Sequence, residues 1–225
     1  MPRRASLALA LAPLVLIPTV AFAQIGAFGA TTLPSRRGTL SMAGLRLFNP
    51  PTMGPRAAPV RVVAFVDYQC PYSARSYRAI RDTSLAMPGV LQASIAHYPL
   101  DGSCNPALSS AMHPQACLAA RAAICAQRQG RFWEMSDQLF AMGRALDPAM
   151  VDAAAAAAQL DMPGYAGCMT SQLPDHHIAQ DVAVAQQIPV RGTPLLIIND
   201  GTHPGSIDQQ RFEALVRHLA AGGTW

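Results

Sequence analysis

A single cysteine stands where an apolar strand is expected to pass into a helix. The run Val60 to Val66 is apolar and β-branched, and Cys70-Pro71 follows it closely. Proline is favoured at the first helical position, so Cys70 is predicted to be the N-cap residue. Unpaired N–H groups and the helix dipole would then face the sulfur and favour the nucleophilic thiolate. The alternative is a buried cysteine that acts as a small apolar side chain.

The cysteine count leaves one thiol over. The chain has five cysteines, and in an oxidising compartment an odd number leaves one cysteine outside the disulfides. The position of Cys70 between a strand and a helix identifies it as the free one. The remaining four are predicted to form two structural disulfides: Cys104, Cys117, Cys125 and Cys168.

The spacing of these four restricts how they pair. Cys117 and Cys125 lie eight residues apart on one expected helix, which separates them by about 12 Å along its axis. A disulfide needs Cα atoms within roughly 7 Å, so these two cannot pair with each other. Two connectivities remain, and we favour Cys104–Cys117 with Cys125–Cys168. The alternative function for Cys104 and Cys117 is a redox pair that exchanges with Cys70.

The histidines give weaker signals. A metal site built from His97, His113 and two of the cysteines has usable spacing, but an oxidising compartment favours disulfides, so no metal is predicted. We expect His97, near a strand end, to be a structural histidine with satisfied hydrogen bonds. The adjacent pair His176-His177 is expected to be exposed, because neighbouring residues splay apart on a helix.

Apolar periodicity predicts the elements that position these residues. Strands are expected at 60–66, 90–98 and 193–199, with a short antiparallel partner at 202–205 after the turn signal Asn199-Asp200-Gly201. Another short strand is expected near 40–48. Helices are expected at 71–87, 114–129, 132–142, 148–160, 161–170, 174–187 and 208–221, with His113 and Pro114 beginning the second. Residues 100–187 would therefore be an all-helical insertion between two strands.

The first 23 residues are predicted to be a signal peptide. Two arginines precede an apolar run and a small-x-small cleavage site after Ala23, and residues 24–57 resemble a loose leader rich in Gly, Pro, Ser and Thr. The expected location is therefore periplasmic or secreted. The formal charge is +4 without a basic cluster, so no nucleic-acid partner is predicted. The sequence contains no lysine, which excludes lysine-based catalysis.

Two stretches resemble the DsbA-like branch of the thioredoxin superfamily. Phe65-x-Asp67-Tyr68-x-Cys70-Pro71-Tyr72-Ser73 is similar to its Cys-Pro-x-Cys active site, and the segment 190–199, with Gly192-Thr193-Pro194, is similar to its cis-proline loop. The resemblance covers roughly residues 58–222. It implies an α/β thioredoxin fold over 58–225, a central mixed sheet flanked by helices, with the helical insertion. It also implies that Thr193 and Pro194 lie against Cys70, where Thr193 would pair with an extended substrate.

Two departures from the family pattern affect the mechanism. Ser73 replaces the second active-site cysteine, and Ala64 replaces the acid usually found six residues before the first. Ser73 cannot resolve a mixed disulfide, so an external thiol must release it. The Ser73 hydroxyl could still donate a hydrogen bond to the thiolate. Asp67 could either disfavour the thiolate or merely cap the turn.

The sequence thus predicts an exported monothiol thiol–disulfide exchange enzyme of the isomerase or reductase type. Its predicted catalytic residues are Cys70, Pro71, Tyr72 and Ser73, and its substrate-binding residues are Thr193 and Pro194. No cofactor is expected, with glutathione as a candidate co-substrate. Expected partners are exported proteins with thiols or disulfides, a small thiol or a membrane redox partner. The alternatives are a redox-inert chaperone or substrate-binding protein, and a thiol that reacts with peroxide or a small electrophile.

Overall fold

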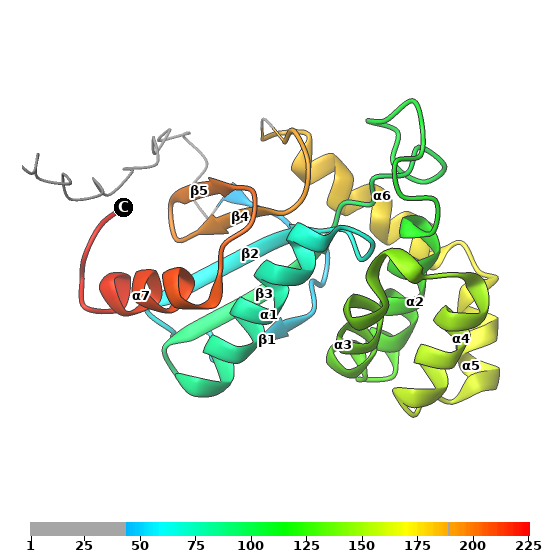
Figure 1. Cartoon of the computed structure of the whole chain (residues 1–225), viewed down its shortest axis with the longest axis horizontal. Coiled ribbons are helices and arrows are strands. Elements are labelled where there is room, and N and C mark those ends of the chain that lie inside the picture. Colours follow the sequence, from blue (N-terminus) through cyan, green and yellow to red (C-terminus); the bar gives the residue numbers. More distant parts are fainter. Residues whose placement is uncertain (1–43, 189) are drawn as a thin grey trace, which may run out of the picture. The chain divides into compact units, whose positions relative to one another are not determined.

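Strand β2, Val60–Val66, lies at the centre of the sheet and ends just before Cys70. The structure, a computed structural model, describes residues 44–188 and 190–225. Strand β3 (Leu91–His97) pairs with β2 in parallel, and β4 (Leu195–Ile198) pairs with its other edge antiparallel. The short strands β1 (Thr52–Met53) and β5 (Gly201–Pro204) complete the order β1-β3-β2-β4-β5 (Figure 1). The expected mixed sheet is confirmed.

Both faces of β2 are covered, which explains its nearly continuous apolar sequence. Val62 and Ala64 belong to a core that includes side chains of α1 (Pro71–Ala86) and α7 (Gln209–Ala220). Val63 and Phe65 belong to a second core with side chains of α6 (Leu173–Ala185). Only Arg61 is exposed in this strand. The alternation of side chains along the strand therefore divides the interior into two apolar layers.

The helical insertion between β3 and β4 is also present. It contains α2 (Ala116–Arg128), α3 (Phe132–Met142), α4 (Pro148–Ala157), α5 (Met162–Met169) and α6, with a short 3₁₀ turn η2 (Gly143–Ala145). Helix α2 contacts each of the other four helices. Its buried positions are mostly alanines, and these small side chains let the neighbouring helices approach closely on several sides.

Some boundaries differ from the sequence prediction. Helix α2 begins at Ala116 with Gln115 as its N-cap, so the assignment of His113 and Pro114 to the helix start is wrong. Helix α4 ends at Ala157 rather than at residue 160. Residues 44–48 form no strand, while residues 40–43, the predicted signal peptide and the leader up to residue 43 lie outside the described part. Within the described ranges, no helix is long and apolar enough to cross a membrane.

The two disulfides have the favoured connectivity. Cys104–Cys117 has a Cα–Cα distance of 5.9 Å, and Cys125–Cys168, which joins α2 to α5, has 5.8 Å. Cys70 is the free cysteine. Cys104 and Cys117, two of the four residues weighed as metal ligands, are bonded to each other.

A buried polar cluster lies between β3 and α6. The backbone N–H of His97 donates to Oδ2 of Asp181 at 2.8 Å. Both ring nitrogens of His97, Nε2 of His177 and Oδ1 of Asp181 lack a hydrogen-bond partner among the described residues. Nε2 of His177 is 3.9 Å from Oδ2 of Asp181, too far for a hydrogen bond. Two predictions were therefore wrong: His97 is not satisfied, and His177 is buried although its neighbour His176 is exposed.

Burial sets the protonation states in this cluster. It raises the pKa of Asp181 to about 8, against the smaller opposing effect of the His97 N–H. It also lowers the pKa of His97 to about 3, with a further contribution from His177. In the unfolded chain these groups titrate near pH 3.9 and 6.5, roughly. Asp181 should therefore make the fold less stable as the pH rises from about 4 to 8. His97 should make it less stable as the pH drops from about 6.5 to 3.

Asp181→Asn tests the alkaline side of this behaviour. The amide cannot ionise, so the unfolding free energy of the variant relative to the wild type should increase by on the order of a few kcal/mol between pH 5 and pH 8. Urea unfolding at both pH values measures this difference. Asp175→Asn, an exposed position on the same helix, is the control and should show no such trend. An equal pH dependence in wild type and Asp181→Asn would contradict the prediction.

Loss of the Cys125–Cys168 disulfide should destabilise the insertion. This bond spans 43 residues, and its removal should lower the unfolding free energy by about 4 kcal/mol on the chain-entropy account. Unfolding of the Cys125→Ala/Cys168→Ala double variant measures the effect. Cys104→Ala/Cys117→Ala, with a shorter separation of 13 residues, should lose about 3 kcal/mol.

Candidate active site

Cys70 is the N-cap residue of α1. Its backbone is extended, with φ −80° and ψ 116°, and Pro71 occupies the first helical position. The Cys70 carbonyl accepts the N–H of Ala74 at 3.0 Å. Pro71 has no N–H, so the unpaired backbone donors of the first turn belong to Tyr72 and Ser73. These two donors and the helix dipole favour negative charge at this end of the helix.

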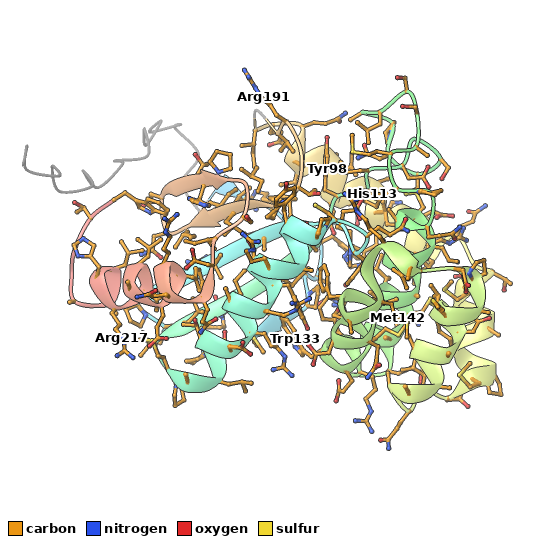
Figure 2. The ribbon with its side chains drawn as sticks, in the orientation of Figure 1. Tyr98, His113, Trp133, Met142, Arg191 and Arg217 are labelled. Atoms are coloured by element: carbon orange, nitrogen blue, oxygen red, sulfur yellow. A yellow bond between two sulfur atoms is a disulfide. The ribbon has the colours of Figure 1, made fainter. Side chains whose placement is uncertain are left out.

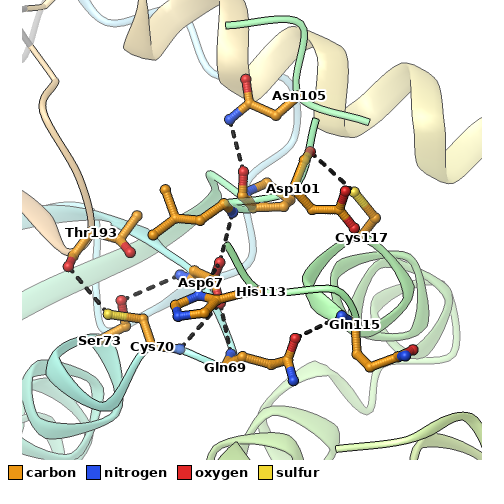
Figure 3. A network of polar contacts seen from close by, with 12 residues as sticks. Asp67, Gln69, Cys70, Ser73, Asp101, Asn105, His113, Gln115, Cys117 and Thr193 are labelled. Carbon is orange, nitrogen blue, oxygen red and sulfur yellow. Dashed lines mark hydrogen bonds and ion pairs between the residues drawn. The ribbon is translucent and has the colours of Figure 1, made fainter. Parts of the chain in front are cut away.

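The sulfur of Cys70 lies against the loop that precedes β4. Sγ is 3.3 Å from the carbonyl oxygen of Thr193, to which the thiol donates. The Thr193–Pro194 peptide bond is cis. Strands β2 and β4 are hydrogen-bonded neighbours, and their pairing brings together residues that are 123 positions apart in the chain. The structure thus places Thr193, which the cis bond joins to Pro194, beside Cys70 (Figure 3).

The hydroxyl of Ser73, which could have donated to the Cys70 sulfur, is hydrogen-bonded to the backbone of Asp67. It accepts the backbone N–H of Asp67 at 3.3 Å, and the side chain is fully buried. No hydrogen bond joins Ser73 to Cys70, although both side chains are described. Tyr72 is 57% exposed, so its ring is available beside the sulfur-bearing turn. Ala64 is buried in β2 and leaves this position without an ionisable group.

Asp67 is the polar centre of the site. Its Oδ1 accepts the backbone N–H groups of Gln69 at 2.7 Å and Cys70 at 3.1 Å. Its Oδ2 accepts the N–H of Leu100 at 2.7 Å and lies 3.0 Å from Nδ1 of His113. With Nδ1 of His113 as the donor, the Asp67 side chain accepts four hydrogen bonds. Asp67 therefore does cap the turn, and it also binds two segments outside it.

The residues that reach Asp67 from the insertion come from the disulfide-bonded loop. Both Met112 and His113 donate backbone hydrogen bonds to the Leu100 carbonyl, at 2.9 and 3.1 Å. Asn105 Nδ2 donates to the Pro99 carbonyl at 2.8 Å. Together with the Cys104–Cys117 bond, these contacts fix the path of residues 99–113.

A second link joins the cysteine turn to helix α2. The N–H of Gln115, the N-cap residue, donates to Oε1 of Gln69 at 2.7 Å. Neither this role of Gln69 and Gln115 nor the contact of His113 with Asp67 was predicted from the sequence. The available signal was the His113-Pro114 pair just before a helix, which was interpreted as a cap. These contacts close a polar network between the reactive turn and the insertion (Figure 3).

Comparison with known proteins places these features in a family. A family model described as Thioredoxin matches residues 48–218. A thioredoxin-like oxidoreductase from Silicibacter pomeroyi DSS-3 has a similar structure, with a TM-score of 0.64, 26% identity, and coverage of 78% of this chain and 94% of that chain. For a periplasmic thioredoxin-like protein from Salmonella enterica serovar Typhimurium, the TM-score is 0.63 and the identity 22%, with coverage of 78% of this chain and 94% of that chain. For alpha-DsbA1 from Wolbachia pipientis, the TM-score is 0.64 and the identity 16%, with coverage of 79% of this chain and 94% of that chain.

Curated relatives share sequence over a part of their length. The Na(+)/H(+) antiporter NhaA 3 of Salinispora tropica is 34% identical over 163 residues, which is 72% of this chain and 24% of that protein. The Na(+)/H(+) antiporter NhaA 1 of Salinispora arenicola is 34% identical over 169 residues, which is 75% of this chain and 24% of that protein. The chain therefore spans about a quarter of the length of these relatives. Because the family model covers most of the sequence, this chain belongs to the thioredoxin family.

Proposed function

We propose that this protein is an exported thiol–disulfide exchange enzyme that works with one thiol, Cys70. The observation that carries the proposal is the placement of a free cysteine at the N-terminus of α1, beside the Thr193 carbonyl, with serine in place of a second thiol. The printed names of two structural neighbours, a thioredoxin-like oxidoreductase and a periplasmic thioredoxin-like protein, support the reaction class and the location. The proposal concerns this domain only, because the antiporter relatives are about four times longer than the matched segment.

The reaction proceeds in two exchange steps. The Cys70 thiolate attacks one sulfur of a substrate disulfide, forms a mixed disulfide with it and releases the other sulfur as a thiolate. A thiolate from outside the site then attacks the mixed disulfide and regenerates Cys70. When that thiolate belongs to the substrate, the net result is isomerisation. When that thiolate is glutathione, the substrate sulfur is left bound to glutathione, and a third exchange with a second glutathione frees the substrate thiol and forms glutathione disulfide.

The backbone at the cis-proline loop is suited to hold an extended substrate. The N–H of Thr193 has no acceptor among the described residues, and its carbonyl accepts only the Cys70 thiol there. A substrate strand that pairs with Thr193 would bring its disulfide next to Sγ, as in other β-augmentation complexes. Partners would be exported proteins with thiols or disulfides, and a small thiol or a membrane protein would supply electrons.

The redox-inert alternative has one observation in its favour. The Cys70 residue is only 4% exposed, and such burial is common for unreactive cysteines. In that case the backbone at Thr193 would bind polypeptides without exchange. The reaction of Cys70 with a simple disulfide separates the two functions.

Oxidised glutathione should form a mixed disulfide with Cys70 and release one glutathione thiol per protein. Intact mass and peptide mapping detect the adduct, and Cys70→Ser should form none. Ser73→Cys is the matched variant: its introduced thiol should release the adduct without external thiol, whereas the wild-type adduct should persist until thiol is added. Absence of an adduct, or reshuffling of scrambled ribonuclease that survives in Cys70→Ala, would contradict the proposal.

His113 should influence Cys70 through Asp67. His113→Ala removes one donor from a buried carboxylate, so we expect a loss of about 1.5–3 kcal/mol in unfolding free energy. The less compensated negative charge beside the turn should disfavour the thiolate and slow alkylation of Cys70 by iodoacetamide at pH 7. His113→Asn retains a donor near the position of Nδ1 and should restore much of the rate. His176→Ala, at an exposed position on α6, is the control, and an equal slowing in this variant would refute the link.

A further inference from the structure

The two disulfides of the insertion have different surroundings. Cys104 is partly exposed in the loop 101–112, most of whose residues are exposed, and it is bonded to Cys117. Cys125 is fully buried in an apolar core, and its partner Cys168 lies near the C-terminal end of α5, where the helix dipole disfavours a thiolate. A thiol from solution can therefore reach Cys104, whereas attack at Cys168 would leave a charged sulfur in an apolar core.

Cys117 is placed to leave as a thiolate when Cys104 is attacked. It is the second residue of α2, and the hydroxyl of Ser103 donates to its sulfur at 3.2 Å. The backbone N–H groups of Cys117 and Leu118 have no acceptor among the described residues, so these donors and the helix dipole favour negative charge at this end of α2. The Asp101 carbonyl lies 3.5 Å from the same sulfur and would accept its hydrogen bond once the thiolate is protonated (Figure 3).

The same disulfide anchors the loop whose ends bind Asp67. The N–H of Leu100 precedes the loop and Nδ1 of His113 follows it, and both reach Oδ2 of the carboxylate. His113 lies where the loop leads into the helices (Figure 2). Among the described residues, the covalent bond and every hydrogen bond from the loop 101–112 to α2 end on Cys117. Breaking the disulfide therefore removes the covalent anchor of the loop and allows it to open more often.

We infer that Cys104–Cys117 is a redox-active disulfide whose reduction by a small thiol lowers the reactivity of Cys70 through Asp67. The thiolate of a reductant such as glutathione attacks the Cys104 sulfur, forms a mixed disulfide there and releases the Cys117 thiolate. A second reductant thiolate attacks the reductant sulfur of this mixed disulfide, forms the disulfide of the reductant and frees the Cys104 thiolate. Two electrons thus pass from two reductant thiols to the protein disulfide, and the protons of those thiols end on the two cysteines.

Reduction acts on Cys70 because an open loop withdraws two of the four donors from Asp67. The carboxylate keeps the backbone N–H groups of Gln69 and Cys70, but its charge beside the turn is then less compensated, which disfavours the Cys70 thiolate. This effect does not depend on disulfide exchange by Cys70, because alkylation with iodoacetamide measures the reactivity of the thiol directly.

The order in which reduced glutathione opens the two disulfides tests the site. Samples taken over time are blocked with N-ethylmaleimide and mapped by peptide mass spectrometry. We expect Cys104–Cys117 to open at least about tenfold faster than Cys125–Cys168, because the deeply buried sulfur is the poorer leaving group. Equal rates, or faster opening of Cys125–Cys168, would overturn the assignment.

Ser103→Ala tests the stabilisation of the leaving sulfur. Loss of the hydroxyl donor should slow the opening of Cys104–Cys117 by about two- to tenfold. Ser109→Ala is the control, at an exposed position of the same loop whose side chain makes no hydrogen bond to a described residue. It should open at the wild-type rate, and equal rates in the two variants would contradict the role of Ser103.

The alkylation rate of Cys70 tests the link to the reactive turn. Arg61 and Arg75 flank Cys70 with no other cysteine between them, so trypsin releases it in a peptide of its own. After selective reduction and removal of glutathione, the rate at Cys70 should fall at least about twofold at pH 7 and return on reoxidation. In His113→Ala, where one donor to Asp67 is already lost, reduction should change the rate less. An unchanged Cys70 rate in the selectively reduced wild type would overturn the inference.

A variant without the bond provides the second measurement. Cys104→Ala/Cys117→Ala should show the lower Cys70 rate without any reductant, and glutathione should not lower it further. Circular dichroism checks that this variant and the reduced wild type are folded, and unfolding on selective reduction would contradict a regulatory role. Failure of Cys70 to form an adduct with oxidised glutathione would overturn the exchange function alone, because a redox-dependent alkylation rate would still support this inference.

Discussion

The buried carboxylate of Asp67 is the interaction on which the arrangement of this site depends. Removing an ionised group from water is costly unless hydrogen bonds replace the lost hydration. Asp67 obtains four donors, two from the turn that carries Cys70 and two from the loop that leads into the insertion. None of these segments can shift without leaving a buried oxygen unpaired. A single side chain thereby fixes the cysteine turn and the insertion loop relative to each other.

The sheet supplies the second constraint. Pairing of β2 with β4 fixes the distance between the end of β2 and the start of β4. Cys70 extends beyond one strand and Thr193 precedes the other, so sulfur and carbonyl meet at one end of this pair. In the resting structure the thiol is occupied with that carbonyl. In the proposed reaction, a substrate that paired with the same backbone would replace this hydrogen bond and release the thiol.

The elements and the disulfides could be predicted because they depend on local patterns. The uniform apolar run of β2, the Pro71 start of α1 and the helical spacing that excluded a Cys117–Cys125 bond each require only a short stretch of sequence. The contacts of His113 and the burial of His177 depend on which segments meet in space, and local patterns carry no such information. His113-Pro114 matched a helix start, but the histidine ring is used by Asp67 instead. The hydroxyl of Ser73 was likewise expected at the sulfur and is bound by the Asp67 N–H.

The shared carboxylate also has a dynamic consequence. Amide protons that end on one acceptor are released together when that acceptor moves, so their exchange with solvent reports one cooperative opening. The amides of Gln69, Cys70 and Leu100 all donate to Asp67, although they belong to two segments of the chain. Local opening of the loop after β3 would therefore loosen the cysteine turn as well. We therefore expect the thiol and the insertion loop to open together, as one unit that crosses the boundary between sheet and insertion.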